Sequence, residues 1–438
     1  MREAIGCGID FGSSNSAVSV AFDDGSVELV TVGSGSMPAS LRSFIYLHRD
    51  GNQQTGEGAI REYLYTGSNR TRCFECDRVG YGRDHGPCQN YVPFGGCNDS
   101  RLMDGLKFML ANEYFSRTHS WGRDFSVEDL VAIIVGHLKR AAEKVAGTRL
   151  ANVVLGKPFG FVGAEAGDFE ALQAMAVQRL VDGARLAGFT TIETMYEAEA
   201  AGQVELPPVG YTLALDFGGG TFDVAVLSRE TAQASVRIVG LQGAPIGGNE
   251  FDGLLFDKYV WKQLGIPETR TSVSKKQLRT LSEVQWLISD RRFRHELAVL
   301  SHSGVDTNAV DAIVSGGHAY EFYRQIEEAK LRLSDHDEAK IEFHRPGIAV
   351  SATVTRAGFE ELIEPALNRI DAAVDRALTE ACAIGADVSG VMFTGGSSSI
   401  PAFRRRMMTK VPSAHHLELP PFTAVAEGLG RKAVALWS

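Results

Sequence analysis

The sequence predicts an α/β protein built from two similar lobes around a central cleft. Strand-like and helix-like hydrophobic patterns alternate through almost the whole chain, which is typical of α/β architectures. One pattern also occurs twice: an apolar strand ends in an aspartate and runs into a glycine-rich turn, first at 8–15 and again at 213–223. Repetition of such a unit indicates a duplicated lobe.

Length and charge limit the classes of protein to consider. At 438 residues the chain suits two or three core-forming units. A net charge of −10 argues against a nucleic-acid or anionic-membrane partner, because both attract basic surfaces. The N-terminus lacks the apolar core of a signal peptide, and no run reaches the ~18 apolar residues of a membrane span. We therefore expect a cytoplasmic protein.

The first lobe is expected over residues 1–209. Its best-defined element is a helix over about 127–146, with Ser126 as N-cap, apolar residues at helical spacing, and Gly147 at its end. Between 23 and about 101 the hydrophobic pattern weakens, which indicates a peripheral insertion outside the core. The other expected elements are strands at 4–11, 16–22, 151–155 and 190–196, and a helix over about 165–187.

The second lobe is expected over residues 210–438, after a boundary at Pro207 and Pro208. A peripheral subdomain is expected over about 249–315, and a long helix begins at Thr355. The final helix, over about 423–437, is expected to cross back to the first lobe. The other expected elements are strands at 211–216, 222–228, 235–241, 340–344, 348–354 and 391–394, and helices over about 274–295, over 318–334 and from Pro401.

The two aspartate–glycine turns have the composition of an anion-binding site. Glycines let the backbone approach a phosphate closely, and successive amides can then point at it. A carboxylate beside a phosphate is repulsive unless a cation lies between them, so Asp10 and Asp216 imply Mg²⁺. Two such turns facing each other predict a nucleoside triphosphate bound between the lobes.

The cysteines are unevenly distributed. Cys7 and Cys382 lie in apolar contexts typical of core thiols. In a cytoplasmic chain a cysteine cluster indicates a metal more than disulfides, and a Cys-x-x-Cys pair has zinc-knuckle spacing. No second such pair completes the pattern, so both a zinc site and unligated or redox-labile thiols remain as interpretations. The four clustered residues are Cys73, Cys76, Cys88 and Cys97.

A set of landmarks in a fixed order identifies a resemblance. They are the first phosphate turn (10–15), a connecting segment with Pro158 and Glu197, the second phosphate turn (216–223), the turn 247–252, and the segment 395–397. With them the chain resembles the nucleotide-binding domain of actin, sugar kinases and the seventy-kilodalton heat-shock chaperones. It is most similar to the heat-shock type, in its truncated YegD-like branch, over nearly the whole chain. This resemblance implies an actin-like ATPase fold with ribonuclease H-like duplicated lobes.

The resemblance assigns roles at the phosphate end. Asp10 and Asp216 would hold Mg²⁺ mostly through its waters. Lys107 would supply the fixed cation for the departing phosphate. Asp223, as general base, and Glu197 would orient the attacking water. The backbone or hydroxyl groups that would cradle the phosphates of ATP or ADP belong to Gly12, Ser13, Ser14, Gly218, Gly219, Gly220 and Thr221.

Plainer interpretations exist for some of these residues. A lysine near an apolar helix is often a solvated head on a buried stem, which is the alternative for Lys107. Glu197 begins a helix, where an acidic residue favours the dipole whatever its other role. Glu327 and Lys330 have the spacing of an exposed helical ion pair.

The adenosine end departs from the chaperone pattern. Ser399 replaces the arginine that stacks on adenine, Leu331 replaces another basic neighbour, and Phe422 stands where an acidic residue is expected. These departures predict altered affinity or base preference beside intact phosphate machinery. The residues that the resemblance places around the adenosine are Glu327, Lys330, Ser334, Gly395, Gly396 and Ser397. Gly247 and Gly248, in the turn 247–252, are further nucleotide-binding candidates.

The expected function is therefore that of an ATP-binding, slowly hydrolysing switch whose lobe arrangement is read by an unidentified protein partner. A peptide-binding domain of the chaperone type is not expected. The alternative is a non-hydrolysing ATP-binding regulator or an actin-like assembly protein. A small-molecule kinase is less favoured, because no carboxylate base for a second substrate is identifiable.

Overall fold

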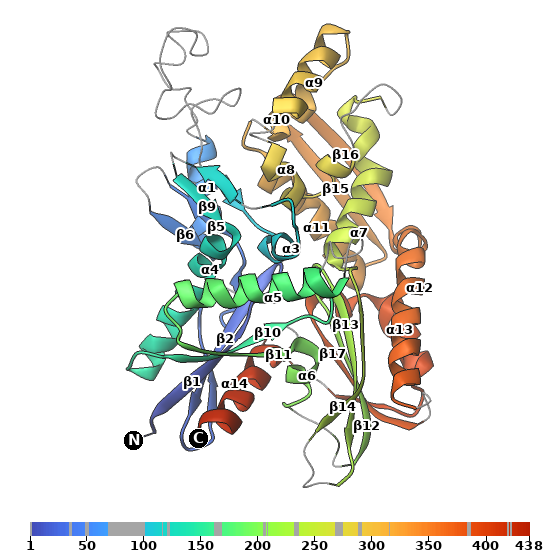
Figure 1. Ribbon diagram of the computed structural model, residues 1–438. Coiled ribbons are helices and arrows are strands. Elements are labelled where there is room, and N and C mark those ends of the chain that lie inside the picture. The colour runs from blue at the N-terminus through green and yellow to red at the C-terminus, as the bar shows by residue number, and fades with distance from the viewer. Residues whose placement is uncertain are drawn as a thin grey trace.

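The protein divides into two α/β halves that stand side by side (Figure 1). Neither the clustered cysteines at 73–97 nor Phe422 belongs to the part of the chain that the structure describes. The computed structural model describes residues 2–34, 37–48, 52–68, 101–115, 117–120, 123–161, 169–204, 207, 209–231, 236–267, 275–287, 291–314, 316–382, 387–417, 420 and 423–438.

The first half is built on a six-stranded sheet in the order β11-β10-β1-β2-β3, with β4 paired to β2. Strand β1 runs antiparallel to β2 and parallel to β10. The strands are β1 (Ala4–Asp10), β2 (Asn15–Phe22), β3 (Val27–Leu29), β4 (Leu41–Arg42), β10 (Asn152–Lys157) and β11 (Thr191–Tyr196).

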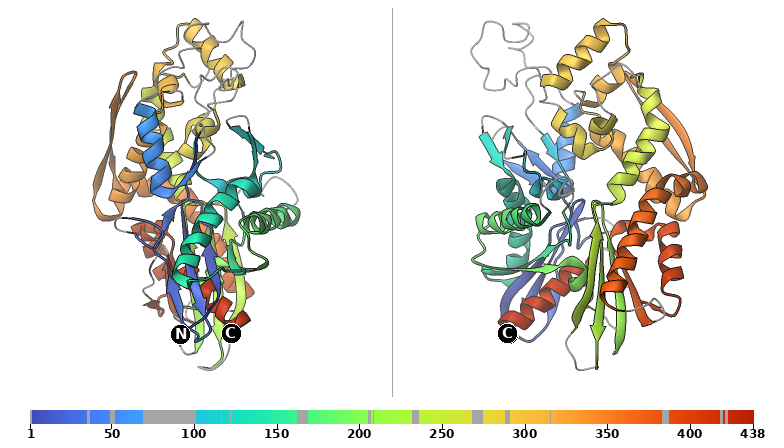
Figure 2. Two further views of the ribbon diagram at one scale, coloured as in Figure 1. Left: turned by 90° about the vertical axis from the view of Figure 1, so that its left-hand side faces the viewer. Right: turned by 45° about the vertical axis from the view of Figure 1, so that its right-hand side comes forward.

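Helices cover both faces of this sheet. On one face, Cys7 and Ile9 of β1 share a hydrophobic core with α4 (Val127–Ala146) and α5 (Phe169–Leu186). Helix α4 begins at a capping box formed by Ser126 and Asp129 and ends at Gly147, as predicted. The opposite face of β1 packs against the C-terminal helix α14 (Ala424–Trp437), which Figure 2 shows beside the strands of this half.

The close packing of α14 requires a bare strand surface. A Cβ on Gly8 would lie 2.3 Å from the backbone nitrogen of Gly430, and a Cβ on Gly6 would lie 2.7 Å from Trp437. The final helix of the chain is therefore seated directly on the first strand.

Part of the segment that the sequence predicted to be a peripheral insertion, 23–101, belongs to the core. Strand β3 extends the main sheet, and Val30, Leu41 and Ile45 are buried in the same core as α4. The pattern is weak because these strands are very short. Above the sheet lie β5 (Ile45–Leu47), β6 (Gln53–Thr55), α1 (Gly56–Ser68), β7 (Arg101–Met103), α3 (Leu106–Leu110), β8 (Arg117–Ser120) and β9 (Arg123–Ser126).

The second half repeats the arrangement of the first. Its five-stranded sheet has the order β14-β13-β12-β17-β18, with β12 antiparallel to β13 and parallel to β17. The short helix α6 (Glu197–Ala201) connects the halves. This lower part contains β12 (Gly210–Phe217), β13 (Phe222–Arg229), β14 (Arg237–Ala244), α12 (Arg356–Glu380), β17 (Val388–Thr394), α13 (Pro401–Lys410) and β18 (His415–Leu417).

The upper part of the second half is mostly helical. The single helix expected over 274–295 is wrong: a 3₁₀ turn is followed by separate helices, the first of which begins where the Thr280 hydroxyl accepts from the Glu283 amide. Cys382, expected in the core, is exposed with φ 52°. The elements are α7 (Gly248–Leu255), a π-helix (Phe256–Val260), 3₁₀ turns (Trp261–Leu264, Lys275–Leu278), α8 (Leu281–Leu287), α9 (Arg291–His302), α10 (Asn308–Val314), α11 (Ala319–Asp335), β15 (Glu338–Arg345) and β16 (Ile348–Thr355).

Candidate active site

The two phosphate turns follow β1 and β12, the corresponding strands of the two sheets. In the second turn, the Gly218 amide donates to the Thr221 carbonyl at 3.0 Å, and Asp216 and Asp223 are cross-strand partners. In the first, Ser43 supports the backbone: its amide donates to the Ser14 carbonyl at 2.9 Å and its hydroxyl to the Gly12 carbonyl at 2.8 Å.

The turns from the two halves meet each other. A Cβ on Gly219 would lie 2.3 Å from the Ser14 hydroxyl, and one on Gly220 would lie 2.7 Å from the Ser13 hydroxyl. A side chain at either position would therefore force the opposite serine hydroxyl to move, which adds a second reason for glycine beside the predicted approach to a phosphate. The paired turns form one backbone-lined surface instead of two separate loops.

Two more landmarks dock onto the second turn. The amides of Gly248 and Asn249 donate to the carbonyls of Gly218 and Gly219, at 3.0 and 2.8 Å. From the other side, the Ser397 hydroxyl donates to the Gly218 carbonyl at 2.9 Å. Gly395 has φ +77°, and a Cβ there would lie 2.3 Å from a backbone oxygen, so that segment also needs a glycine.

Lys107 and Glu197 form a buried ion pair. The Lys107 Nζ donates to both carboxylate oxygens of Glu197, at 2.6 and 2.9 Å, and the residues are 5% and 3% exposed. Burial would lower the pKa of Lys107, but Glu197, Asp10 and Asp223 together outweigh it and the pKa is raised. Lys107 is thus a fixed, charged ammonium and not a solvated surface head.

Further carboxylates surround this pair. Burial, reinforced by the charge of Glu197, raises the pKa of Asp216 to about 6 and raises the pKa values of Asp10 and Asp223 well above their usual range. The group therefore holds four wholly or partly buried carboxylates around the single ammonium of Lys107, so acidic groups outnumber the cation.

Two buried side-chain oxygen atoms, one in this group and one at the start of β2, have no hydrogen-bond partner among the described residues. They are the Oδ2 of Asp223 and the Oδ1 of Asn15. The other oxygen of Asp223 accepts from the Phe159 amide at 2.7 Å, immediately after Pro158. Buried polar atoms are normally paired. The Asp223 oxygen therefore indicates a ligand, ion or water beside the carboxylates, and the Asn15 oxygen indicates one at the start of β2.

Two of the residues expected around the adenosine, Lys330 and Glu327, have hydrogen-bond partners within the protein. Lys330 donates to the Gly248 carbonyl at 3.0 Å and to Asp252 at 2.7 Å. Glu327 accepts two bonds of 3.3 Å from Arg42, which belongs to the first half, and one of 2.8 Å from Arg324. Glu327 and Lys330 therefore do not form an exposed ion pair with each other, which was the plainer interpretation.

The charge of Glu327 is strongly stabilised. Burial would raise its pKa, but Arg42, Lys330 and Arg324 together lower it to about 2. Ser334 lies one turn further along α11 and is half-buried. Leu331 and Ser399, two of the positions that depart from the chaperone pattern, are exposed.

The two halves also meet above the phosphate turns. The Asp104 amide donates to the Gln285 side-chain oxygen, and the Gln285 amide group donates to the carbonyl and carboxylate of Asp104, each at 3.0 Å. Phe44 and Tyr320 stack edge to face with centroids 5.7 Å apart. We call the Asp104–Gln285 pair the interlobe clamp.

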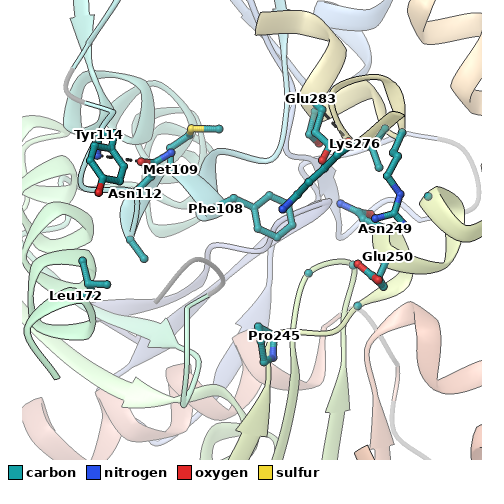
Figure 3. A pocket seen from close by; sticks show the side chains of 18 of the residues that line it. Phe108, Met109, Asn112, Tyr114, Leu172, Pro245, Asn249, Glu250, Lys276 and Glu283 are labelled. Atoms are coloured by element: carbon teal, nitrogen blue, oxygen red, sulfur yellow. Dashed lines mark hydrogen bonds between the residues drawn. The ribbon is translucent and has the colours of Figure 1, made fainter. Parts of the chain in front are cut away.

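A cavity of about 590 Å³ opens beside the second phosphate turn. Gly219 and Gly220 form part of its wall, and Figure 3 shows Phe108 in its centre between Asn112 on one side and Asn249 and Glu250 on the other. The cavity places solvent-accessible space directly against the glycine cradle.

Comparison with known proteins identifies the family. The model of the family described as Hsp70 protein matches residues 6–285 and 302–436. The chain belongs to the Hsp70 family. Its fold is accordingly the Hsp70-type nucleotide-binding domain of the actin-like ATPase superfamily, as the sequence predicted.

Individual Hsp70-family relatives are similar at a modest level. Chaperone protein HscA of Cronobacter sakazakii is 29% identical over 272 residues, covering 61% of this chain and 34% of the relative. The HscA homolog of Bordetella petrii is 26% identical over 313 residues, covering 71% and 41%. HscA of Escherichia coli O9:H4 is 28% identical over 289 residues, covering 65% and 36%. The chain thus spans well under half the length of these relatives.

The structure bears on metal chelation and membrane spans only within the described residues. The described ranges contain no group of three or more His, Cys, Asp or Glu side chains arranged to chelate a metal ion, and the predicted zinc cysteines lie outside those ranges. No helix among the described residues is long and apolar enough to cross a bilayer.

Sequence reasoning missed the contacts between the halves. Arg42 and Gln285 were not singled out, because they lie in segments interpreted as peripheral, and Asp104 lies just beyond the first of these segments. A charged residue such as Arg42 immediately before the apolar segment 44–47 was the available signal, but its partner lies 285 positions away.

Proposed function

We propose that this Hsp70-family chain binds ATP with Mg²⁺ between its two phosphate turns and hydrolyses it slowly, acting as a nucleotide-driven switch. The observation that carries the proposal is the contact between the two glycine turns directly beside the buried Lys107–Glu197 pair. A backbone cradle and a fixed cation are the parts that phosphoryl transfer requires.

The described residues fit Mg²⁺ and a triphosphate. The carboxylates of the site outnumber the Lys107 ammonium, and the Oδ2 of Asp223 and the Oδ1 of Asn15 have no hydrogen-bond partner among the described residues. Asp10 and Asp216 would hold the ion, largely through its waters. When bound, Mg²⁺ neutralises charge on the phosphate oxygens.

The remaining roles belong to side chains. Lys107 would stabilise negative charge on the transferred phosphoryl group. Asp223, whose orientation is fixed by the Phe159 amide, would accept the proton of the attacking water at its unpaired oxygen. Glu197 would hold the Lys107 ammonium in place and help to orient that water.

A switch also needs a link between the nucleotide and the lobes. The interlobe clamp and the Arg42–Glu327 pair both join the two halves, and Asp104, Arg42 and Glu327 line one small pocket together. A ligand that favours one lobe arrangement would shift the balance of these contacts, and a protein partner would read the result.

The direct test is phosphate release from ATP by the purified protein with Mg²⁺, compared with Asp10→Ala. We expect slow release by the wild type and none above background by the variant. Equal release by both proteins would overturn the hydrolytic part of the proposal.

The exposed, altered adenosine end favours one second candidate, an ATP-binding regulator or assembly protein without hydrolysis. ATP binding without phosphate release, together with ATP-dependent sedimentation that rises with protein concentration, would support that candidate. A monomer that hydrolyses ATP would exclude the assembly form.

A further inference from the structure

We infer that Arg179 of α5 is a positioning residue that fixes α3 and thereby directs the Lys107 ammonium to the phosphate site; this inference rests on the proposed hydrolysis. The Arg179 guanidinium gathers the backbone at the C-terminal end of α3. Its Nη1 donates to the carbonyls of Met109, Leu110 and Asn112 at 3.1, 3.1 and 3.0 Å, and its Nη2 donates to Phe115 at 3.3 Å.

Helix α3 depends on outside support. It spans the five residues Leu106–Leu110, which is too short for a stable isolated helix. The last carbonyls of any helix lack partners within it, and a cation near that end is favoured by the dipole. The Arg179 guanidinium places a cation at this end, and it bonds the Met109 and Leu110 carbonyls of the last turn together with the Asn112 and Phe115 carbonyls that follow, with shared hydrogens at Nη1.

Arg179 is itself held in place. Its Nε lies 3.6 Å from the Glu128 carboxylate in the first turn of α4, and its side chain is largely withdrawn from solvent. The guanidinium therefore connects α3, α4 and α5, so the position of α3 depends on the packed pair α4 and α5.

The other side of α3 faces the catalytic group. A Cβ on Gly220 would lie 2.6 Å from the ring of Phe108, so α3 packs directly on the second phosphate turn. Lys107 precedes Phe108, and Gly105, with φ +62°, begins the helix against Ser282 of the opposite half. A shift of α3 by about 1 Å would displace the Lys107 Nζ, and misplacements of that size cost roughly 100-fold in rate.

The test compares Arg179→Met and Arg179→Lys with wild type. Arg179→Met keeps the apolar stem and removes every donor, whereas Arg179→Lys keeps the charge and one donor group. Arg185→Met is the matched control, because Arg185 lies on the same helix but pairs with Asp182 at the surface. The measurements are kcat and KM for ATP, the melting temperature, and the rate at which acetic anhydride labels the Lys107 amine, followed by mass spectrometry.

We expect Arg179→Met to lower kcat by roughly 10- to 100-fold with KM nearly unchanged. Arg179→Lys should recover part of the loss, and Arg185→Met should match wild type. Without nucleotide, Lys107 labelling should accelerate in Arg179→Met but not in Arg185→Met, since Lys107 is 5% exposed in the native arrangement.

The outcomes separate this inference from the proposed hydrolysis. A wild type that releases no phosphate defeats the proposed function, and Lys107 labelling then still decides the positioning role. Unchanged labelling of Lys107 in Arg179→Met overturns the inference. So does a uniform rise in labelling of all lysines with a large fall in melting temperature, which would show a general structural role.

Discussion

The phosphate end and the adenosine end of the cleft are built in different ways. At the phosphate end, a side chain on Gly219 or Gly220 would collide with the opposite turn, and Lys107 is buried against Glu197. At the adenosine end, Leu331 and Ser399 lie on the surface. Packing therefore constrains the first region tightly, whereas these two positions of the second can change without disturbing the fold.

The largest effect is expected from removing the phosphate-end cation. Lys107→Met should lower kcat for ATP hydrolysis by about 10²- to 10³-fold, because a fixed charge in a buried site is lost. Phosphate release under single-turnover conditions measures it. Since the variant leaves the Glu197 carboxylate buried without its partner, Lys107→Met/Glu197→Gln is the control for stability. A wild-type rate in the double variant would contradict the role of Lys107.

The second effect tests the close contact between the turns. Gly220→Ala should weaken ATP binding by roughly 10- to 100-fold, because its Cβ would lie 2.7 Å from the Ser13 hydroxyl of the opposite turn and 2.6 Å from Phe108. Gly218→Ala should have a much smaller effect, since the nearest atom to its Cβ would be 3.7 Å away. Calorimetric titration with Mg·ATP compares them. Equal losses in the two variants would mean that the contact between the turns is not what demands glycine.

The third effect concerns the interlobe clamp between the two ends. Burial raises the pKa of Asp104 to about 6. Because this exceeds the unfolded value, the net contribution of Asp104 to stability is greatest below about pH 4 and falls as pH rises to about 6, even though the Gln285 bond favours the ionised carboxylate. The free energy of unfolding of wild type minus that of Asp104→Asn should fall by on the order of 1 kcal/mol between pH 4 and 7. Denaturant titrations at several pH values would show a flat difference if Asp104 titrates normally.

The smallest effect tests the altered adenosine end. Ser399→Arg should strengthen ATP binding about two- to fourfold, because a guanidinium there can stack on the base at an exposed site. Ser399→Met is the control for added length without charge. Binding of ATP that is unchanged in Ser399→Arg, or improved equally in Ser399→Met, would show that this position no longer faces the nucleotide.

The sequence predicted the features that depend on local pattern. The helix that begins at Ser126 and ends at Gly147 carries its caps in the sequence, and each phosphate turn carries its own glycines. Contacts that depend on tertiary structure left no such mark. The bonds from Arg179 to α3 and from Arg42 to Glu327 join segments that are unrelated in sequence. Residues 23–48, part of the predicted insertion 23–101, were expected outside the core because their strands are too short to show a clear alternation of apolar and polar residues.

We expect the phosphate end to provide most of the nucleotide affinity and the adenosine end to provide little discrimination between bases. Calorimetric titration of the wild-type protein with Mg·ATP, Mg·GTP and Mg·tripolyphosphate tests it most directly. The account predicts dissociation constants for ATP and GTP within about tenfold of each other, or about 1.4 kcal/mol, and displacement of ATP by tripolyphosphate. ATP binding more than about 100-fold tighter than GTP, with no competition from tripolyphosphate, would contradict the account.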